Sequence, residues 1–249
     1  MTAPSYCVII PSYNSGPALV NTVDAVSGLG LPVWVVLDGS TDGSEAAIGQ
    51  NGVSSVAVIS LQQNVGKGGA VLAGMQAARG QRFTHAVVMD ADGQHDVGSV
   101  IPFIEKSIEN PDALILGVPI FGPDAPIERV KGRRIGNWFA NLDSLWLGID
   151  DSLFGFRVYP LEPSIAILSS IRSARRFDFD TELAVRLVWA GVKPINLKTR
   201  VFYPAASDGG VSHFRYVRDN VLLVCTHARL IVGMVLRLPR LCRLRRQWL

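Results

Sequence analysis

The sequence is poor in cysteine and in targeting signals. Three cysteines occur, Cys7, Cys225 and Cys242, and they lie far apart in apolar or basic surroundings. Because they fit neither a disulfide framework nor a zinc site, we expect the protein in a reducing cytosol. The first residues lack the basic start and long apolar region of a signal peptide, so none is expected. The sequence also contains no internal repeat and no low-complexity tract.

Two widespread phosphate-binding motifs are missing as well. The Walker spacing G-x-x-x-x-G-K-[ST] does not occur, and no G-x-G-x-x-G follows the first expected strand. The common NTPase and dinucleotide-binding classes are therefore disfavoured. Charged residues make up 18% of the 249 residues and hydrophobic residues 48%. This composition indicates a globular protein with a substantial core, in one large domain or two small ones.

Short apolar runs alternate with helical patterns along the chain. Strands are expected at residues 6–10, 33–37, 56–60, 85–89 and 113–117, within 150–159, and at 192–202. Helices are expected at residues 17–27, 69–79, 97–109 and 129–147, and from about residue 177. Because the first four strands alternate with helices, we expect a parallel α/β sheet.

Polar clusters follow the first four expected strands, at residues 11–16, 38–44, 64–69 and 90–95. Ligands of parallel sheets bind at the carboxyl ends of the strands, so these clusters predict one site for a polar, phosphorylated ligand. The glycine-rich cluster 64–69 suits phosphate, since such turns present backbone N–H groups at a helix N-terminus. A plain tight turn with a solvated lysine is the alternative.

The fourth cluster contains two carboxylates, Asp90 and Asp92, directly after an apolar run. If the strand continues, residues at i and i+2 face the same side. Two carboxylates that close repel each other unless a cation lies between them. Oxygen ligands select Mg²⁺ or Mn²⁺, so a divalent cation is the first interpretation. A polar turn, in which Asp and Gly are common, is the other.

The second half of the chain holds further candidates. Residues 121–128 form a Pro/Gly-containing loop of a length that often acts as a lid. The helix expected at 129–147 carries Arg133 and Arg134 near its start. Asp180 is placed to act as the N-cap of the next helix, a structural role that competes with a catalytic one.

Charge is unevenly distributed. Residues 215–249 contain eight arginines and one aspartate, a local charge of +7, so the preceding residues carry −4 of the total of +3. A long helix is expected at 214–238 with a wide apolar face, and His227 and Arg229 argue against a membrane span. We expect this helix to lie in a membrane interface, with the arginines on anionic headgroups. A helix docked on the protein's own core is the alternative. No aromatic stacking platform accompanies the basic end, so nucleic acid is not expected.

Six motifs in order resemble those of the inverting family 2 glycosyltransferases, most closely the dolichyl- or polyprenyl-phosphate sugar synthases. They are VIIPSYN at 8–14, DGSTDG at 38–43, NVGKGGA at 64–70, MDADGQH at 89–95, DSLFGFR at 151–157 and FDFD at 177–180. The resemblance covers about residues 6–200. It implies a GT-A fold, a Rossmann-like mostly parallel sheet flanked by helices, at 1–210, followed by a basic amphipathic membrane-associating helix at 211–249.

The resemblance also implies a set of site residues. The metal ligands would be Asp90, Asp92 and Gln94, holding Mg²⁺ or Mn²⁺ against the diphosphate of a UDP- or GDP-sugar. The nucleotide-sugar donor would be contacted by Pro11, Tyr13, Asn14, Asp38 and Lys67, with Arg133 or Arg134 near phosphate. The catalytic set would be Asp92, Arg157 on the acceptor side, and a base if one is needed, with Asp180 first and Asp151, Asp178 and Glu182 behind it.

Four departures from the family pattern leave the nucleotide and the acceptor open. Leu37 and Ser15 stand where the family often has acidic residues. The family's Gly-Ser-Arg is Gly117-Val118-Pro119, which removes one phosphate-binding arginine, and Arg129 and Arg133 are the candidate substitutes. The family's Gly-x-Ser-Lys near the acceptor is replaced by residues 208–215.

Three functions therefore stay open. The first is sugar transfer, with inversion, to a lipid-linked acceptor at the cytoplasmic membrane face, in cell-envelope glycan or glycolipid synthesis. The second is a soluble glycosyl- or nucleotidyltransferase with a water-soluble acceptor. The third is a non-catalytic nucleotide-sugar binding protein.

Overall fold

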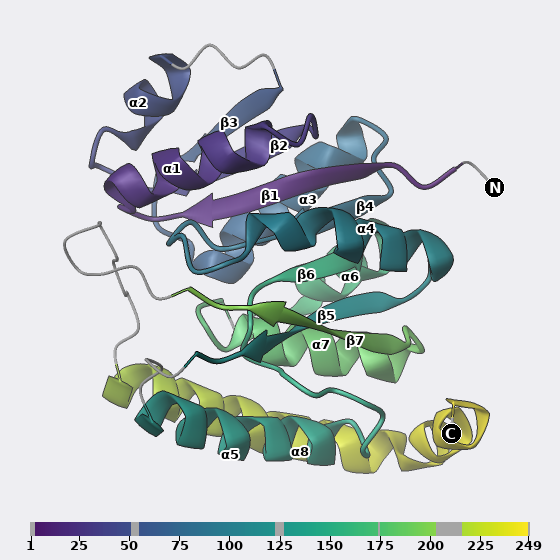
Figure 1. Ribbon diagram of the computed structural model, residues 1–249. Helices are drawn as coiled ribbons and strands as arrows, with labels where there is room; N and C mark the ends of the chain where they lie inside the picture. Colours follow the sequence, from purple (N-terminus) through teal and green to yellow (C-terminus); the bar gives the residue numbers. More distant parts are fainter. Residues whose placement is uncertain (1–2, 51–54, 123–126, 174, 203–215, 249) are drawn as a thin grey trace.

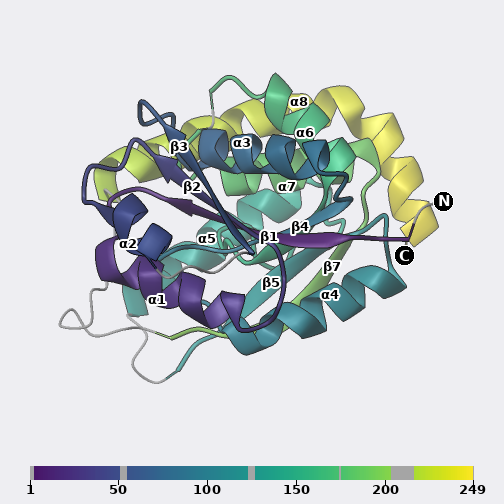
Figure 2. The same ribbon diagram turned by 90° about the horizontal axis from the view of Figure 1, so that it is seen from above.

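The protein folds around one twisted seven-stranded sheet with helices on both faces (Figures 1 and 2). The computed structural model describes residues 3–50, 55–122, 127–173, 175–202 and 216–248. Four residues of the expected lid, 123–126, lie outside this part, as do 203–215. The division into domains at residue 210 therefore stays a prediction.

The strands follow the expected apolar runs. They are β1 Tyr6–Ser12, β2 Val33–Asp38, β3 Val56–Leu61, β4 His85–Val88, β5 Leu114–Ile120, β6 Arg157–Pro160 and β7 Pro194–Arg200. Their order in the sheet is β3-β2-β1-β4-β6-β5-β7. Only β6 runs antiparallel to its neighbours, β4 and β5, among the described strands. The expected mostly parallel sheet is confirmed.

The helices cover both faces of this sheet. They are α1 Gly16–Ser27, α2 Ser44–Gln50, α3 Lys67–Gly80, α4 Val100–Glu109, α5 Ile127–Asp143, α6 Leu161–Ser170, α7 Phe179–Ala190 and α8 Tyr216–Trp248, with a 3₁₀ turn at Val97–Ser99. Helices α2 and α6 were not among the expected helices. Both are short, and short periodic patterns are a weak signal.

The alternation of side chains along β1 divides the core in two. Cys7 and Ile9 pack with α3 and α7 on one face, whereas Val8 and Ile10 pack with α1 and α4 on the other. A strand buried on both faces must be apolar at every position, which explains the continuous run that predicted it.

Helix α8 packs against α5 and α7 (Figure 1). One face of α8 is buried in the core through Leu230, Met234 and Leu241. The alternative of a helix docked on the protein's own core therefore holds for this face. The predicted end near residue 238 is wrong, because the helix contains Pro239 and continues to Trp248. By length and composition alone, Arg218–Trp248 would suffice to cross a membrane.

Candidate active site

A pocket opens where the carboxyl ends of β1, β2 and β4 meet. Its lining includes Pro11, Tyr13, Ser15, Asp38, Asn64, Lys67, Asp90, Asp92, Arg176 and Phe177. The polar clusters predicted to share an edge of the sheet therefore do so. Of the residues predicted to bind the donor or the metal, Asn14, Gln94, Arg133 and Arg134 are not part of this lining. Their roles stay predictions.

Asp90 and Asp92 lie in a turn, because β4 ends at Val88. The strand alternation used to place them on one side is therefore wrong, although both carboxylates line the pocket. The turn holds itself together. The Gln94 N–H donates to Asp92 Oδ1 at 3.0 Å, and the Asp90 N–H donates to Nδ1 of His95 at 3.0 Å. Gly93 supplies the left-handed conformation, with a φ of 71°.

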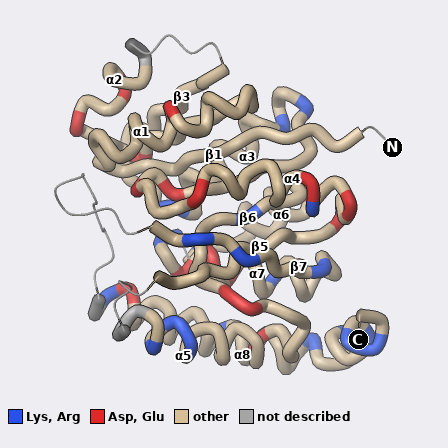
Figure 3. Tube along the Cα trace, viewed as in Figure 1, with Lys and Arg blue, Asp and Glu red and all other residues tan. Residues whose placement is uncertain are grey.

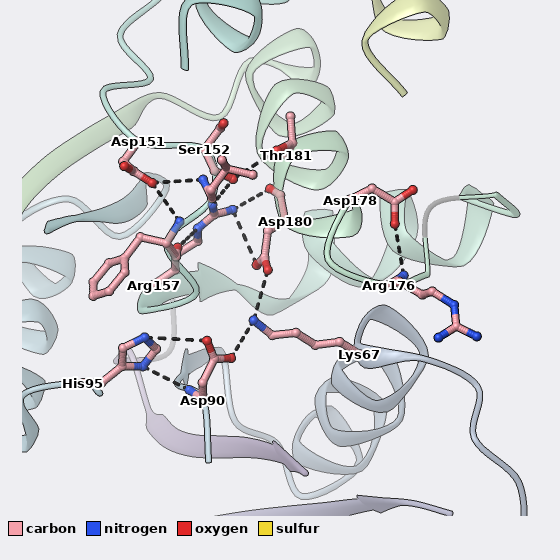
Figure 4. Close-up of polar contacts among 12 residues, drawn as sticks. Lys67, Asp90, His95, Asp151, Ser152, Arg157, Arg176, Asp178, Asp180 and Thr181 are labelled. Carbon is pink, nitrogen blue, oxygen red and sulfur yellow. Dashed lines mark hydrogen bonds and ion pairs between the residues drawn. The ribbon is translucent and has the colours of Figure 1, made fainter. Parts of the chain in front are cut away.

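Lys67, the first residue of α3, connects two distant carboxylates (Figure 4). Its Nζ lies 2.5 Å from Asp90 Oδ1 and 3.0 Å from Asp180 Oδ2. Burial alone would lower the pKa of Lys67, but the two carboxylates raise it, so the ammonium stays charged. Gly155 lies against this pair: a Cβ there would come within 2.7 Å of Lys67 Nζ and of Asp90 Oδ2. The absence of a side chain at 155 is thus required for the contact.

The pKa values of Asp90 and Asp92 are shifted in opposite directions. Burial raises the pKa of Asp90, but Lys67 and His95 outweigh it and the pKa is lowered. Burial, together with the charge of Asp90, raises the pKa of Asp92 to about 6. Burial lowers the pKa of His95 to about 4, so its imidazole is neutral at pH 7. No salt bridge in the described structure reaches Asp92.

This arrangement fits a divalent cation held mainly by carboxylate oxygen. Asp92 lacks a cationic partner in the described residues, and a cation there would offset both causes of its raised pKa. Asp90 is already paired with Lys67, so it can offer only its remaining oxygen lone pairs. Among the described residues, no group of three or more His, Cys, Asp or Glu side chains is placed to hold a metal. Any ion would therefore need further ligands from the substrate or from water.

The predicted acceptor-side residues form a buried network behind the pocket (Figure 4). Arg157 is fully buried, and its guanidinium donates to the carbonyl oxygens of Ser152, Phe154 and Asp180 at 2.6–2.9 Å. Thr181 Oγ1 also donates to the Ser152 carbonyl, at 3.2 Å. Arg157 thus fixes the loop before β6 against the start of α7.

Asp151 is engaged on both of its oxygens. Oδ1 accepts from Arg133 at 2.7 Å and from the N–H groups of Leu153 and Phe154, and Oδ2 accepts from Asn137 at 3.1 Å. Arg133 also lies over the rings of Phe121 and Phe154. The pair joins α5 to the loop before β6.

The prediction that Asp180 is the N-cap of α7 is wrong, because the N-cap of this helix is Asp178. The helix begins two residues earlier than the capping pattern indicated. The Asp180 side chain points instead to Lys67, and its Oδ1, buried without a hydrogen-bond partner, lies 3.9 Å from Arg157 Nη1. Burial and two flanking cations thus fix this carboxylate in place.

The glycine-rich loop uses its N–H groups internally. Val65 and Gly66 donate to the two oxygens of Asp38 at 2.7 and 2.9 Å, and Gly68 donates to the Arg175 carbonyl at 2.9 Å. The loop is therefore a turn anchored by the protein, and its phosphate-cradle interpretation is wrong for these three groups. Asn14 Oδ1 likewise accepts a hydrogen bond within the protein, from the Thr41 N–H at 2.7 Å.

Arg176 is the site residue that the sequence analysis missed. It lines the pocket beside Phe177 and has an exposed side chain. The signal was its position, since it directly precedes the Phe177–Asp180 motif.

Comparisons with known proteins show the family of this chain. Residues 7–168 match the family described as Glycosyl transferase family 2. The glycosyltransferase AglJ of Haloferax volcanii is 24% identical over 226 residues, which cover 89% of this chain and 70% of that protein. The UDP-N-acetylglucosamine–dolichyl-phosphate N-acetylglucosaminyltransferase of Methanococcus voltae is 25% identical over 196 residues, covering 72% and 78%. A dolichyl-phosphate β-glucosyltransferase of Drosophila melanogaster is 39% identical over 101 residues, covering 34% and 30%.

Solved structures share the fold at low identity. The structure of S. aureus TarS 1–349 in complex with UDP-GlcNAc aligns with a TM-score of 0.56 and 12% identity, over 94% of this chain and 72% of that one. A 4-diphosphocytidyl-2C-methyl-D-erythritol synthase aligns with a TM-score of 0.53 and 11% identity, over 90% and 99%. The GT-A-type fold is thus shown, while the family rests on the sequence match. Because that match spans most of the sheet and the pocket it carries, the chain belongs to glycosyl transferase family 2.

Proposed function

We propose that this glycosyltransferase moves a sugar from a nucleotide-diphosphate donor, with inversion, to a polyprenyl-phosphate-type lipid at the cytoplasmic membrane face. The observation that carries the proposal is the pocket at the strand ends, where Asp38, Asp90 and Asp92 come together. The names of two relatives support it, since both specify dolichyl phosphate and one specifies a UDP-sugar. A role in cell-envelope glycan or glycolipid synthesis follows from such an acceptor.

The charge of the pocket supports the use of a divalent cation. The described lining contains three carboxylates and two cations, Lys67 and Arg176, so its formal charge is −1. A donor diphosphate would be repelled by this surface unless further positive charge accompanied it. Mg²⁺ or Mn²⁺ held by Asp90 and Asp92 would supply that charge and stabilise the leaving diphosphate. Gln94 stays a predicted third ligand.

The candidate bases favour a phosphate acceptor over a hydroxyl. Asp180 is paired with Lys67, and Asp151 accepts four hydrogen bonds. Asp178 accepts from the Arg176 N–H and from Thr226 Oγ1, and Glu182 is paired with Arg186 and Arg229. A hydroxyl acceptor needs a free, positioned base. A phosphate monoester, with a second pKa of about 6, is already a nucleophilic anion at pH 7 and needs none.

An exposed apolar stripe on α8 supports membrane attachment. Val221, Val224, Val232, Val235 and Leu236, the α8 stripe, are 55–76% exposed and recur at helical spacing opposite the docked face. On the neighbouring α5, Ile135 and Trp138 are also more than half exposed. Basic residues lie at the C-terminal end of α8 and on α5 (Figure 3). This combination fits an anionic lipid surface, with tryptophan at the headgroup level.

The test is turnover of a panel of nucleotide sugars with total membrane lipid and Mn²⁺, measured as released nucleoside diphosphate. We expect one donor to turn over only when lipid is present, and Asp92→Asn to abolish this turnover. Glu105→Gln, which removes an exposed carboxylate on α4, is the matched control and should leave the rate unchanged. Turnover with a water-soluble acceptor alone would favour the soluble alternative. Absence of turnover with every donor would favour the non-catalytic one.

A further inference from the structure

Three of the cations predicted as site residues are already engaged by the protein. Lys67 is shared between Asp90 and Asp180, and Arg133 is paired with Asp151 at 2.7 Å. Arg157 is buried and donates to carbonyl oxygens. Each of these charges therefore has a structural partner that a phosphate would have to displace or share.

Several backbone N–H groups that could bind phosphate instead are also engaged within the protein. Three N–H groups of the glycine-rich loop, those of Val65, Gly66 and Gly68, donate to Asp38 and to the Arg175 carbonyl. Gly66 is fixed in this role, because a Cβ there would come within 2.3 Å of the Arg175 carbonyl oxygen and its φ is 86°. The loop thus cannot turn these groups toward a ligand without losing its anchor.

Arg176 differs from Lys67, Arg133 and Arg157. It lines the same pocket as Asp38, Asp90 and Asp92, and its side chain is exposed. In the described structure no carboxylate lies within ion-pair distance of its guanidinium. Its charge reaches the pocket, since it lowers the pKa of Asp38 against the larger, opposing effect of burial. A free guanidinium on a pocket wall can bind two phosphate oxygens at once.

The backbone of Arg176 is held in place although the side chain is free (Figure 4). Its N–H donates to Asp178 Oδ1 at 3.1 Å, and Asp178 Oδ2 accepts from Thr226 of α8 at 3.2 Å. Asp178 thus ties the base of Arg176 to two helices. An anchored backbone with an unpaired charged end limits the entropy lost when a ligand binds.

We propose that Arg176 binds the diphosphate of the donor nucleotide. This inference rests on the proposed function, because it assigns a residue to the donor site. It makes the Arg176 side chain a binding group and leaves Lys67, Arg133 and Arg157 as positioning residues.

The test compares Arg176→Ala with Arg172→Ala, which removes an exposed arginine outside the pocket lining. Dissociation constants are measured by titration calorimetry for UDP and GDP with Mn²⁺, and by competition for uridine and guanosine. We expect Arg176→Ala to weaken binding of the accepted diphosphate roughly 10- to 100-fold, as for loss of a charge-assisted hydrogen bond. Binding of the nucleoside should not change, Arg176→Lys should restore part of the loss, and Arg172→Ala should behave as the wild type.

Three results would contradict the proposal in different ways. Unchanged diphosphate affinity, or an equal loss for the nucleoside, would overturn the role of Arg176 while leaving the proposed function in place. A raised KM for the lipid phosphate with unchanged diphosphate affinity would assign Arg176 to the acceptor and overturn the donor role. Failure of the wild type to bind any nucleoside diphosphate would overturn the proposed function itself.

Discussion

The ammonium of Lys67 lies 3.0 Å from a carboxylate oxygen of Asp180, 113 residues further along the chain. The same ammonium is paired with Asp90 at the end of β4. The Lys67 side chain thus connects the turn after β4, which carries Asp90, to helix α7, which carries Asp180. We therefore expect the ion pairs of Lys67 with Asp90 and Asp180 to affect both the stability of the fold and the geometry of the pocket.

Lys67→Met should destabilise the fold by about 3 kcal/mol at pH 7, because it leaves two buried carboxylates without their partner. The loss should shrink as the pH falls, because protonation neutralises the orphaned carboxylates of the variant. In the wild type the pKa of Asp90 is lowered from its ordinary value of 3.8, so its contribution to stability is still complete at pH 5 and is lost only at lower pH. Urea denaturation at pH 7 and pH 5 therefore measures the effect of the variant.

The control is Lys106→Met, which breaks an exposed pair with Glu109 on α4. Surface pairs contribute little, so its stability should stay within about 1 kcal/mol of the wild type. Equal effects of the two substitutions would show that the Lys67 bridge is not structural.

Asp92→Asn should abolish turnover and yet stabilise the protein at pH 7. The folded pKa of Asp92, about 6, lies above its ordinary value of 3.8, so the folded state binds the proton more tightly than the unfolded state. Its contribution to stability therefore falls as the pH rises from about 4 to about 6. Asparagine removes this penalty, and we expect a gain of about 1–2 kcal/mol at pH 7 that vanishes near pH 4.

Denaturation of both proteins across this range, in EDTA, checks the sign. A variant less stable than the wild type at pH 7, or a difference independent of pH, would contradict the raised pKa. Glu105→Gln again serves as the control, because it removes an exposed carboxylate outside the pocket lining, and its stability should stay within about 0.5 kcal/mol of the wild type.

Gly155→Ala should disrupt the site without removing any charged group. The added Cβ would meet Lys67 Nζ and Asp90 Oδ2 at 2.7 Å, so the ion pair has to move apart. We expect a loss of about 1–3 kcal/mol in stability, typical of overpacking, and a larger relative loss of turnover. Gly80→Ala, at the end of α3, is the control because a Cβ there meets nothing within 4 Å. Full activity of Gly155→Ala would show that the close approach of Gly155 is not needed.

The α8 stripe should govern membrane binding. Replacing Val232 and Leu236 by Gln removes two exposed apolar side chains and leaves the docked face of the helix intact. We expect vesicle binding to weaken roughly tenfold for each side chain that enters the lipid, with stronger binding to anionic than to neutral vesicles. Co-sedimentation with vesicles of both compositions measures this.

Point variants are preferable to deletion of the helix, because deletion would also uncover the core around Leu230 and Met234. Ile108→Gln on α4 changes another exposed apolar residue, 54% exposed, on a different surface and should not change binding. Unchanged binding of the Val232 and Leu236 variant would overturn the lipid-facing role of the stripe.

Much of the fold could be predicted because its signals are local. A strand buried on both faces must be apolar throughout, and β1, β2 and β4 show this in short stretches of sequence. Turn residues indicate where each strand ends, and the carboxyl ends of parallel strands lie at the same edge of the sheet. Helix α8 could also be predicted from a local signal, the helical spacing of its polar residues. Its continuation past Pro239 could not, because local rules disfavour proline inside a helix.

The sequence by itself determined the sheet, the edge that carries the site and the carboxylates that mark it, since each follows from spacing within a few residues. It could not determine which charges stay available for a ligand. That depends on partners far apart in the chain, such as Lys67 with Asp180, and on packing that brings α7 beside the glycine-rich loop. Only the tertiary structure decided that Lys67, Arg133 and Arg157 are engaged and that Arg176 lines the pocket without an ion-pair partner among the described residues, because ion pairing depends on distance in space.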